Sequence, residues 1–233
     1  MLLFSIVVQW PIVHPNVNSM NKNLHVPSQG KKYSDISLTK DDISQEEYKK
    51  FLGGGAAEWE LRGEFQLLFL QSMGLKPDHK FLDVGCGPGR AARFLIDFLS
   101  TGNYTGMDYN PSFIAAAEHM AAILDLSGKN PTFDTVEDFG FPPNYSNFDY
   151  CIVFSVLNHC NPEQRLSFFK HIPYVMATGG KIYISHCKWM KEPTLNHKGL
   201  SVTNVLNDCG IDITKRGWQS GDIFPIVEIT KIA

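Results

Sequence analysis

The chain has 233 residues, of which 43% are hydrophobic and 19% charged, and its formal net charge is −3. These values are ordinary for a globular protein of one domain with some additions. Because there is no excess of basic residues, we expect neither nucleic acid nor an anionic membrane surface to be a partner of the whole domain.

The five cysteines are an odd number, and no two of them have the C-x-x-C spacing. This pattern argues against a disulfide framework and against a zinc site of the usual kind. Several cysteines lie in or beside apolar runs, where a thiol behaves as a small hydrophobe. We therefore expect a reducing, cytoplasmic location and no bound metal.

Residues 1–32 are predicted to form a weakly ordered extension. The apolar stretch 1–13 is shorter than the roughly 20 residues that span a bilayer, and it lacks the basic start of a signal peptide. Residues 14–32 are rich in Asn, Pro, Ser and Gly, a composition that resists packing. We expect no integral membrane segment; a peripheral membrane contact is the alternative.

The rest of the chain, 33–233, is predicted to be a single domain that begins with two helices. These cover 39–52 and 56–73 and are separated by three glycines. Acidic residues at the start of the first helix and lysines at its end suit the helix dipole, and glycine stops it. We expect the two helices to form a lid over the domain.

From residue 80 onward, short apolar runs alternate with helical patterns. Strands are predicted over 80–84, 104–107, 133–136, 150–156 and 181–185, and helices over 91–99, 111–126 and 162–176. A helix over 200–209 and two strands, 211–218 and 223–232, follow. Strands joined by so short a turn can only pair as an antiparallel hairpin. The predicted fold class is α/β: a doubly wound, mostly parallel seven-stranded sheet of order 3-2-1-4-5-7-6 with strand 7 antiparallel.

The segment 81–93 (FLDVGCGPGRAAR) joins the first of these strands to a helix. Its three glycines allow a tight turn and a close approach of the backbone to a ligand. The helix that follows presents free N–H groups and the positive end of its dipole. A dinucleotide fingerprint would have a small residue where this chain has Arg90. Asp83, two residues before the first glycine, suits a cationic amino group better than a pyrophosphate.

The stretch Leu82-Asp83-Val84-Gly85-Cys86-Gly87-Pro88-Gly89 resembles the first motif of class I S-adenosylmethionine-dependent methyltransferases, and the resemblance extends over about 56–233. In that family the loop holds the methionine part of the cofactor. The resemblance thus implies S-adenosylmethionine as the cofactor, bound by Asp83, Gly85, Cys86, Gly87, Gly89 and Arg90. Asp108, which ends the second strand, corresponds to the acid that binds both ribose hydroxyls, and Tyr109 is then expected to lie against the adenine.

The adenine side of the site is less well marked. Relatives usually carry an aspartate just past the third strand, and here that position is Thr135. The backbone of Val136 or the carboxylate of Asp138 can supply the contact instead, and Phe154 at the end of the fourth strand completes the predicted cofactor residues. As acids before a turn, the residues of this segment equally need no function.

The methyl acceptor is expected where strands four and five end. Methyl transfer is an in-line displacement at an activated sulfonium, so the enzyme mainly has to align donor and acceptor. A base is needed only if the acceptor loses a proton, and His159 or His186 can serve. Both histidines equally suit a solvated or turn-forming role.

Three further residues are candidate substrate contacts: Trp59, Arg62 and Asn158. Trp59 and Arg62 belong to the helix that would cover the site. In the alternative interpretation, Trp59 packs inside the lid and Arg62 pairs with a neighbouring acid.

These features together predict a methyltransferase that uses S-adenosylmethionine and acts on a small molecule. One alternative is an NAD(P)-dependent oxidoreductase, against which Asp83 and Arg90 count. Another is a family member that binds the cofactor without catalysis, or that modifies RNA or protein. The acceptor, the methylated atom and the oligomeric state do not follow from the sequence.

Overall fold

The computed structural model describes residues 36–50, 56–185, 200–206 and 226–232. A seven-stranded sheet of order β3-β2-β1-β4-β5-β7-β6 forms its centre. The strands are β1 (Phe81–Val84), β2 (Tyr104–Asp108), β3 (Thr132–Thr135), β4 (Phe148–Val153), β5 (Met176–Ser185), β6 (Leu200–Leu206) and β7 (Ile226–Lys231). The first five run parallel, and β7 is antiparallel to both β5 and β6. The predicted fold class and strand order are confirmed.

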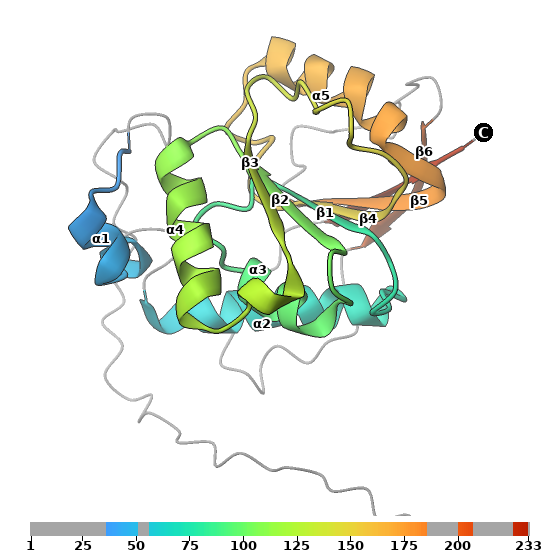
Figure 1. Cartoon of the computed structure of the whole chain (residues 1–233). Coiled ribbons are helices and arrows are strands. Elements are labelled where there is room, and N and C mark those ends of the chain that lie inside the picture. The colour runs from blue at the N-terminus through green and yellow to red at the C-terminus, as the bar shows by residue number, and fades with distance from the viewer. Residues whose placement is uncertain (1–35, 51–55, 186–199, 207–225, 233) are drawn as a thin grey trace, which may run out of the picture.

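The helices cover both faces of this sheet (Figure 1). Near one face lie α2 (Ala56–Ser72), α3 (Ala92–Phe98) and α4 (Pro111–Ile123), while α5 (Pro162–Val175) lies on the other. Two short helices, α1 (Lys40–Ser44) and η3 (Glu47–Lys50), precede α2, and η4 (Ser127–Lys129) follows α4. The alternation of strand and helix places the ends of β1 to β5 along one edge, called here the carboxyl edge.

Two hydrophobic clusters, one on each face, hold the layers together. Phe81 and Tyr150 belong to the cluster under α2 and α3, whereas their neighbours Leu82 and Cys151 belong to the cluster under α5. Successive side chains of a strand point to opposite faces, so strands buried on both sides are apolar throughout. The burial of all four residues of β1 follows from this arrangement.

Two predicted elements are wrong. The helix predicted over 39–52 is shorter and is broken into α1 and η3, since Glu46 between them has a positive φ of 54°. The helix predicted over 200–209 is a strand, β6, in which Val202 and Val205 pair with β7. β-branched residues favour strands when a pairing partner is available. The strand predicted over 211–218 lies outside the described residues.

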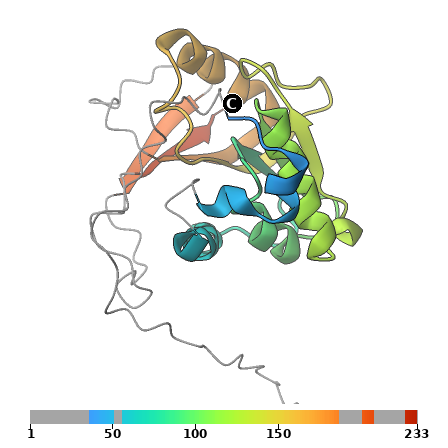
Figure 2. The same cartoon turned by 90° about the vertical axis from the view of Figure 1, so that its left-hand side faces the viewer.

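The segment 36–38, which precedes α1, is anchored on the start of α4 (Figure 2). Asn110 caps α4 by accepting from the Ser112 N–H, and its Nδ2 donates to the Ile36 carbonyl at 2.7 Å. The Leu38 N–H donates to Ser112 Oγ at 3.0 Å. Tyr48 and Trp59 pack edge to face, and both belong to one buried cluster with residues of α4. The lid predicted from the sequence thus covers the carboxyl edge at α4.

Helices α2 and α3 contact each other at Gly63. A Cβ at this position would overlap the carbonyl oxygen of Arg90 and the ring of Phe94. Nearby, Glu60 of α2 forms ion pairs with Lys49 of η3 and with Arg93 of α3. The lid therefore rests directly on the helix that follows the glycine loop.

Among the described residues, no helix is both long and apolar enough to cross a membrane. The predicted extension 1–32 lies outside this part of the chain.

Candidate active site

The glycine loop, residues 85–89, joins β1 to α3 at the carboxyl edge. All three of its glycines have positive φ, 74° at Gly85, 54° at Gly87 and 88° at Gly89, a region that residues with a Cβ avoid. A Cβ at Gly85 would overlap Val156, and one at Gly89 would meet Met120 at 2.5 Å. A Cβ at Gly87 would meet nothing within 4 Å. The outer glycines are needed for packing, and the middle one faces open space where a ligand can approach.

Asp108, the last residue of β2, holds this loop in place. Its Oδ2 accepts from the Gly87 N–H at 3.0 Å and its Oδ1 from the Asn110 N–H at 2.9 Å. The side chain is buried, and burial raises its pKa although these backbone N–H groups act in the opposite direction. Each carboxylate oxygen has a second lone pair. Asp108 can therefore accept further hydrogen bonds, as the hydroxyls of a ribose require.

Asp83 lies at the base of the loop and is only 4% exposed. The hydroxyl of Tyr104 donates to its Oδ2 at 2.9 Å. Burial raises the pKa of Asp83 to about 7, whereas the Tyr104 hydrogen bond and the charge of Arg90 lower it. A buried carboxylate of this kind gains most from a cationic ligand.

Arg90, which follows the loop, lies over the ring of Trp59 with its guanidinium carbon 5.7 Å from the ring centroid. Trp59 itself is buried in the lid cluster, and Arg62 pairs with Glu58 one turn earlier in α2. Trp59 thus packs inside the lid and Arg62 pairs with a neighbouring acid, which was the alternative interpretation of the sequence. Through Arg90, the lid contacts the end of the glycine loop.

The residues predicted for the adenine lie at different depths. Tyr109 is 43% exposed beside Asp108, as a residue that stacks on a base would be. Val136 is buried, and its N–H donates to the Asp108 carbonyl at 2.9 Å. Asp138 is exposed and is tied to α5, since its Oδ1 accepts from Gln164 and its carbonyl from Ser167. Of the three, Tyr109 is the best placed for the adenine.

The acceptor side follows β4. Phe154 packs against Phe69 of α2 with 5.8 Å between ring centroids. Ser155 has a positive φ of 59°, and its N–H donates to Ser185 Oγ at the end of β5 at 2.9 Å. This bond joins the ends of β4 and β5 and turns the chain out of the sheet. Strained backbone of this kind is common at functional sites.

Asn158 and His159 come directly after this turn. The Asn158 amide lies 3.1 Å from His159 Nε2, and Asn158 Oδ1 is buried with no hydrogen-bond partner among the described residues. Burial lowers the pKa of His159, so its imidazole is neutral near pH 7. The other predicted base, His186, lies outside the described residues.

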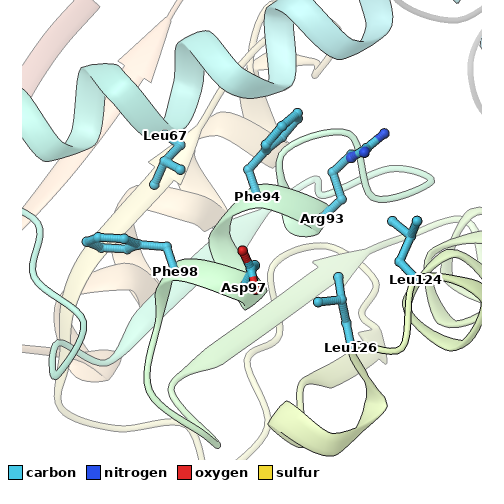
Figure 3. Close-up of a pocket in the computed structure, with 7 residues that line it drawn as sticks. All are labelled: Leu67, Arg93, Phe94, Asp97, Phe98, Leu124 and Leu126. Carbon is cyan, nitrogen blue, oxygen red and sulfur yellow. The ribbon is translucent and has the colours of Figure 1, made fainter. Parts of the chain in front are cut away.

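A shallow groove of about 500 Å³ lies beside α3, away from these residues (Figure 3). It is lined by Leu67, Arg93, Phe94, Asp97, Phe98, Leu124 and Leu126. Neither the glycine loop nor Asp108 contributes to it. The chemistry expected at the carboxyl edge therefore does not involve this groove.

Comparison with known proteins agrees with this geometry. Residues 82–182 match the family described as "Methyltransferase domain". Over 108 residues, 46% of this chain, the sequence is 31% identical to cycloartenol-C-24-methyltransferase 1 of Oryza sativa subsp. japonica. The chain spans less than a third of the curated relatives that it matches, 23% and 30% of their lengths.

Two solved structures illustrate the likeness in fold. Magnesium protoporphyrin IX methyltransferase from Synechocystis PCC 6803, with bound S-adenosylmethionine, superposes with a TM-score of 0.58 at 15% identity and covers 85% of this chain and 100% of its own. The [4+2]-cyclase SpnF superposes with a TM-score of 0.54 at 17% identity and covers 73% and 81%.

Residues 82–182, fewer than half of the chain, match the methyltransferase-domain family, and the fold of the chain resembles that of solved methyltransferase structures. The Synechocystis structure contains bound S-adenosylmethionine. These findings agree with the predicted family and cofactor. Since one of these structures is a [4+2]-cyclase, the fold by itself does not define the reaction.

Two residues that matter for the site were not predicted from the sequence. Tyr104 begins the apolar strand β2 and contacts Asp83 only through the pairing of β1 with β2. Asn110 stands before a proline at a helix start, a position typical of an N-cap. Its second contact, the hydrogen bond from Nδ2 to the Ile36 carbonyl, has no local sequence signature.

Proposed function

We propose that the chain binds S-adenosylmethionine at the carboxyl edge and transfers its methyl group to a small molecule. The observation that carries the proposal is the pair of buried carboxylates, Asp83 and Asp108, on either side of an open position at Gly87. Asp83 would face the ammonium group of the cofactor and Asp108 its ribose. The family match and the cofactor-bound structural neighbour support this arrangement.

A Gly87→Ala variant tests the path of the cofactor. The fold has room for the added methyl group, but this group would occupy space that the bound ligand is expected to fill. We expect the affinity for S-adenosylhomocysteine, measured by calorimetry, to fall about tenfold or more, whereas the loss of stability stays near 1 kcal/mol, as for other alanines at positive φ.

Gly102→Ala is the matched control for this variant. Gly102 also has a positive φ, 81°, and a Cβ there also meets nothing within 4 Å, but it lies in the turn before β2. The backbone cost is therefore the same and the site is untouched. Equal losses of affinity in both variants would show that the cofactor does not pass over Gly87.

The acceptor is proposed to be a small molecule with a protic O–H or N–H group. Asn158 Oδ1 is buried and accepts nothing among the described residues, so it can receive a hydrogen bond from such a group. The neutral imidazole of His159 lies beside it and can take the proton. The rice relative and the Synechocystis neighbour are named for cycloartenol and for magnesium protoporphyrin IX, and both names favour a small-molecule acceptor.

A His159→Gln variant tests this base. If the acceptor loses its proton to His159, kcat falls about 100-fold while the affinity for S-adenosylhomocysteine stays within a factor of about two. Because burial lowers the folded pKa of His159 from 6.5, wild-type kcat at saturating cofactor falls as the pH drops below about 6.5, where the imidazole becomes protonated.

His171→Gln serves as the control, since His171 is exposed on α5. Unchanged kcat in the His159 variant, or the same loss in both variants, would contradict a base at His159.

The whole proposal is tested by a screen of candidate acceptors with S-adenosylmethionine labelled in its methyl group. Transfer of label to a small molecule supports it. Binding of cofactor without transfer to any small molecule, RNA or protein would favour the non-catalytic alternative. Tight binding of a nicotinamide dinucleotide in place of S-adenosylhomocysteine would contradict it.

A further inference from the structure

Beneath the glycine loop, Asp83 and Tyr104 form a buried pair of a carboxylate and a phenol. Asp83 is 4% and Tyr104 2% exposed, and 2.9 Å separates the phenol oxygen from Oδ2. The two residues are on neighbouring strands, β1 and β2. A hydroxyl donates a stronger hydrogen bond to a charged carboxylate than to the neutral acid.

The strand register explains how the contact arises. Asp83 is paired with Gly106, and Phe81 with Tyr104. A Cβ at Gly106 would lie 3.0 Å from the Tyr104 hydroxyl and 3.1 Å from Cys86 Sγ. The hydroxyl therefore occupies space that exists because residue 106 has no side chain. The tyrosine reaches the carboxylate diagonally, from two residues earlier on the adjacent strand.

Packing alone does not require this hydroxyl. The Tyr104 ring stacks with Phe81 at 6.2 Å and tilts against Phe133 at 5.7 Å between centroids. A phenylalanine would make the same ring contacts. The hydroxyl instead supplies a hydrogen bond to the charged form of Asp83, which favours that form over the protonated one.

Resting on the proposed function, in which Asp83 binds the ammonium group of the cofactor, we propose that Tyr104 is a positioning residue for cofactor capture. Its hydroxyl keeps the Asp83 carboxylate charged and oriented, and thereby sets the lower pH limit of cofactor binding.

The charged groups around Asp83 define the direction of this effect. Burial is the largest influence and raises the pKa of Asp83 to about 7; Tyr104 and Arg90 lower it, and Asp108 raises it. The thiols of Cys86 and of Cys151 on β4 also interact with this group, but burial raises the pKa of both, and they stay neutral. The affinity for an ammonium-bearing ligand should therefore fall as the pH drops below about 7 and the carboxylate becomes protonated.

The experiment compares two ligands by calorimetry from about pH 5.5 to 8.5. S-adenosylhomocysteine carries the ammonium group, whereas 5′-methylthioadenosine lacks the whole amino-acid part. For the wild type we expect the affinity for S-adenosylhomocysteine to fall up to about tenfold per pH unit below the midpoint of Asp83 titration. The affinity for 5′-methylthioadenosine should stay constant.

In Tyr104→Phe the midpoint should move up by about one pH unit, because a hydrogen bond to the charged form is lost. The affinity for S-adenosylhomocysteine is then about fivefold weaker at pH 7 and approaches the wild-type value as the pH rises. Binding of 5′-methylthioadenosine stays unchanged.

Tyr150→Phe is the matched control. Tyr150 is also buried on a neighbour of β1, but its hydroxyl donates to the Met73 carbonyl at 3.0 Å, away from the loop. This variant loses a buried hydroxyl and should keep the wild-type midpoint. If Tyr104→Phe does not fold, Gly106→Ala carries the test, because its methyl group displaces the Tyr104 hydroxyl and should shift the midpoint in the same direction.

Two results would overturn the inference: an unchanged midpoint in the folded variant, or equal losses for both ligands at every pH, as a structural role alone would give. Failure of the wild type to bind S-adenosylhomocysteine at any pH would instead contradict the proposed function. The two failures are therefore distinguishable.

Discussion

Replacing Asp108 with alanine is expected to weaken the binding of S-adenosylhomocysteine at least 100-fold. The proposed ribose contact consists of two hydrogen bonds to a charged group, each worth about 1.5–3 kcal/mol. The change also releases the N–H groups of Gly87 and Asn110, which both donate to this carboxylate. The glycine loop thus loses its ligand contact and its anchor together.

Calorimetry measures this loss, and thermal unfolding shows whether the fold survives. Asp97→Asn is the control, since Asp97 is exposed on α3 and the variant should bind and unfold like the wild type. Binding by the folded Asp108→Ala protein within about threefold of the wild type would refute a ribose contact at this residue.

Asp83→Asn should have two opposite effects: it stabilises the free protein and weakens cofactor binding. The folded pKa of Asp83 is about 7, above its ordinary value of 3.8. Between these two values the folded chain binds more protons than the unfolded chain, so this group makes stability fall as the pH rises from about 4 to 7. An amide avoids the buried charge and can still accept from Tyr104.

We expect the free energy of unfolding in urea to increase by on the order of 2 kcal/mol at pH 8 and by less at pH 5. The affinity for S-adenosylhomocysteine should fall about 100-fold at pH 8, because a buried charge partner is lost. Asp97→Asn again serves as the control for both measurements. If the Asp83→Asn protein is less stable than the wild type at pH 8, burying this carboxylate is not costly. Stability given up for binding is common at functional sites.

The elements that carry the proposed cofactor site were predictable because their determinants are local. The glycine loop, the strand before it and the helix after it lie within 81–98, and Asp108 ends the very next strand. Each element follows from residue types and spacing over a few positions. The order of the strands then follows from the right-handed connections of such folds.

Features that depend on distant partners were not predictable in this way. Leu200–Leu206 is a strand because β7 lies beside it, although its leucines also suit a helix. The contact of Tyr104 with Asp83 depends on a strand register and on the glycine at 106. The burial of Trp59 depends on Tyr48, which packs on it from another helix.

The close approach at Gly63 has a consequence for how two ligands affect each other's binding. Because α2 rests on the carbonyl of Arg90 there, with no side chain between them, a displacement of the helix would reach the residue that follows the glycine loop. An acceptor that pushes on α2 would therefore alter the cofactor contacts, and a seated cofactor would stiffen the surface that the acceptor meets. By thermodynamic reciprocity each ligand then changes the affinity for the other by the same factor.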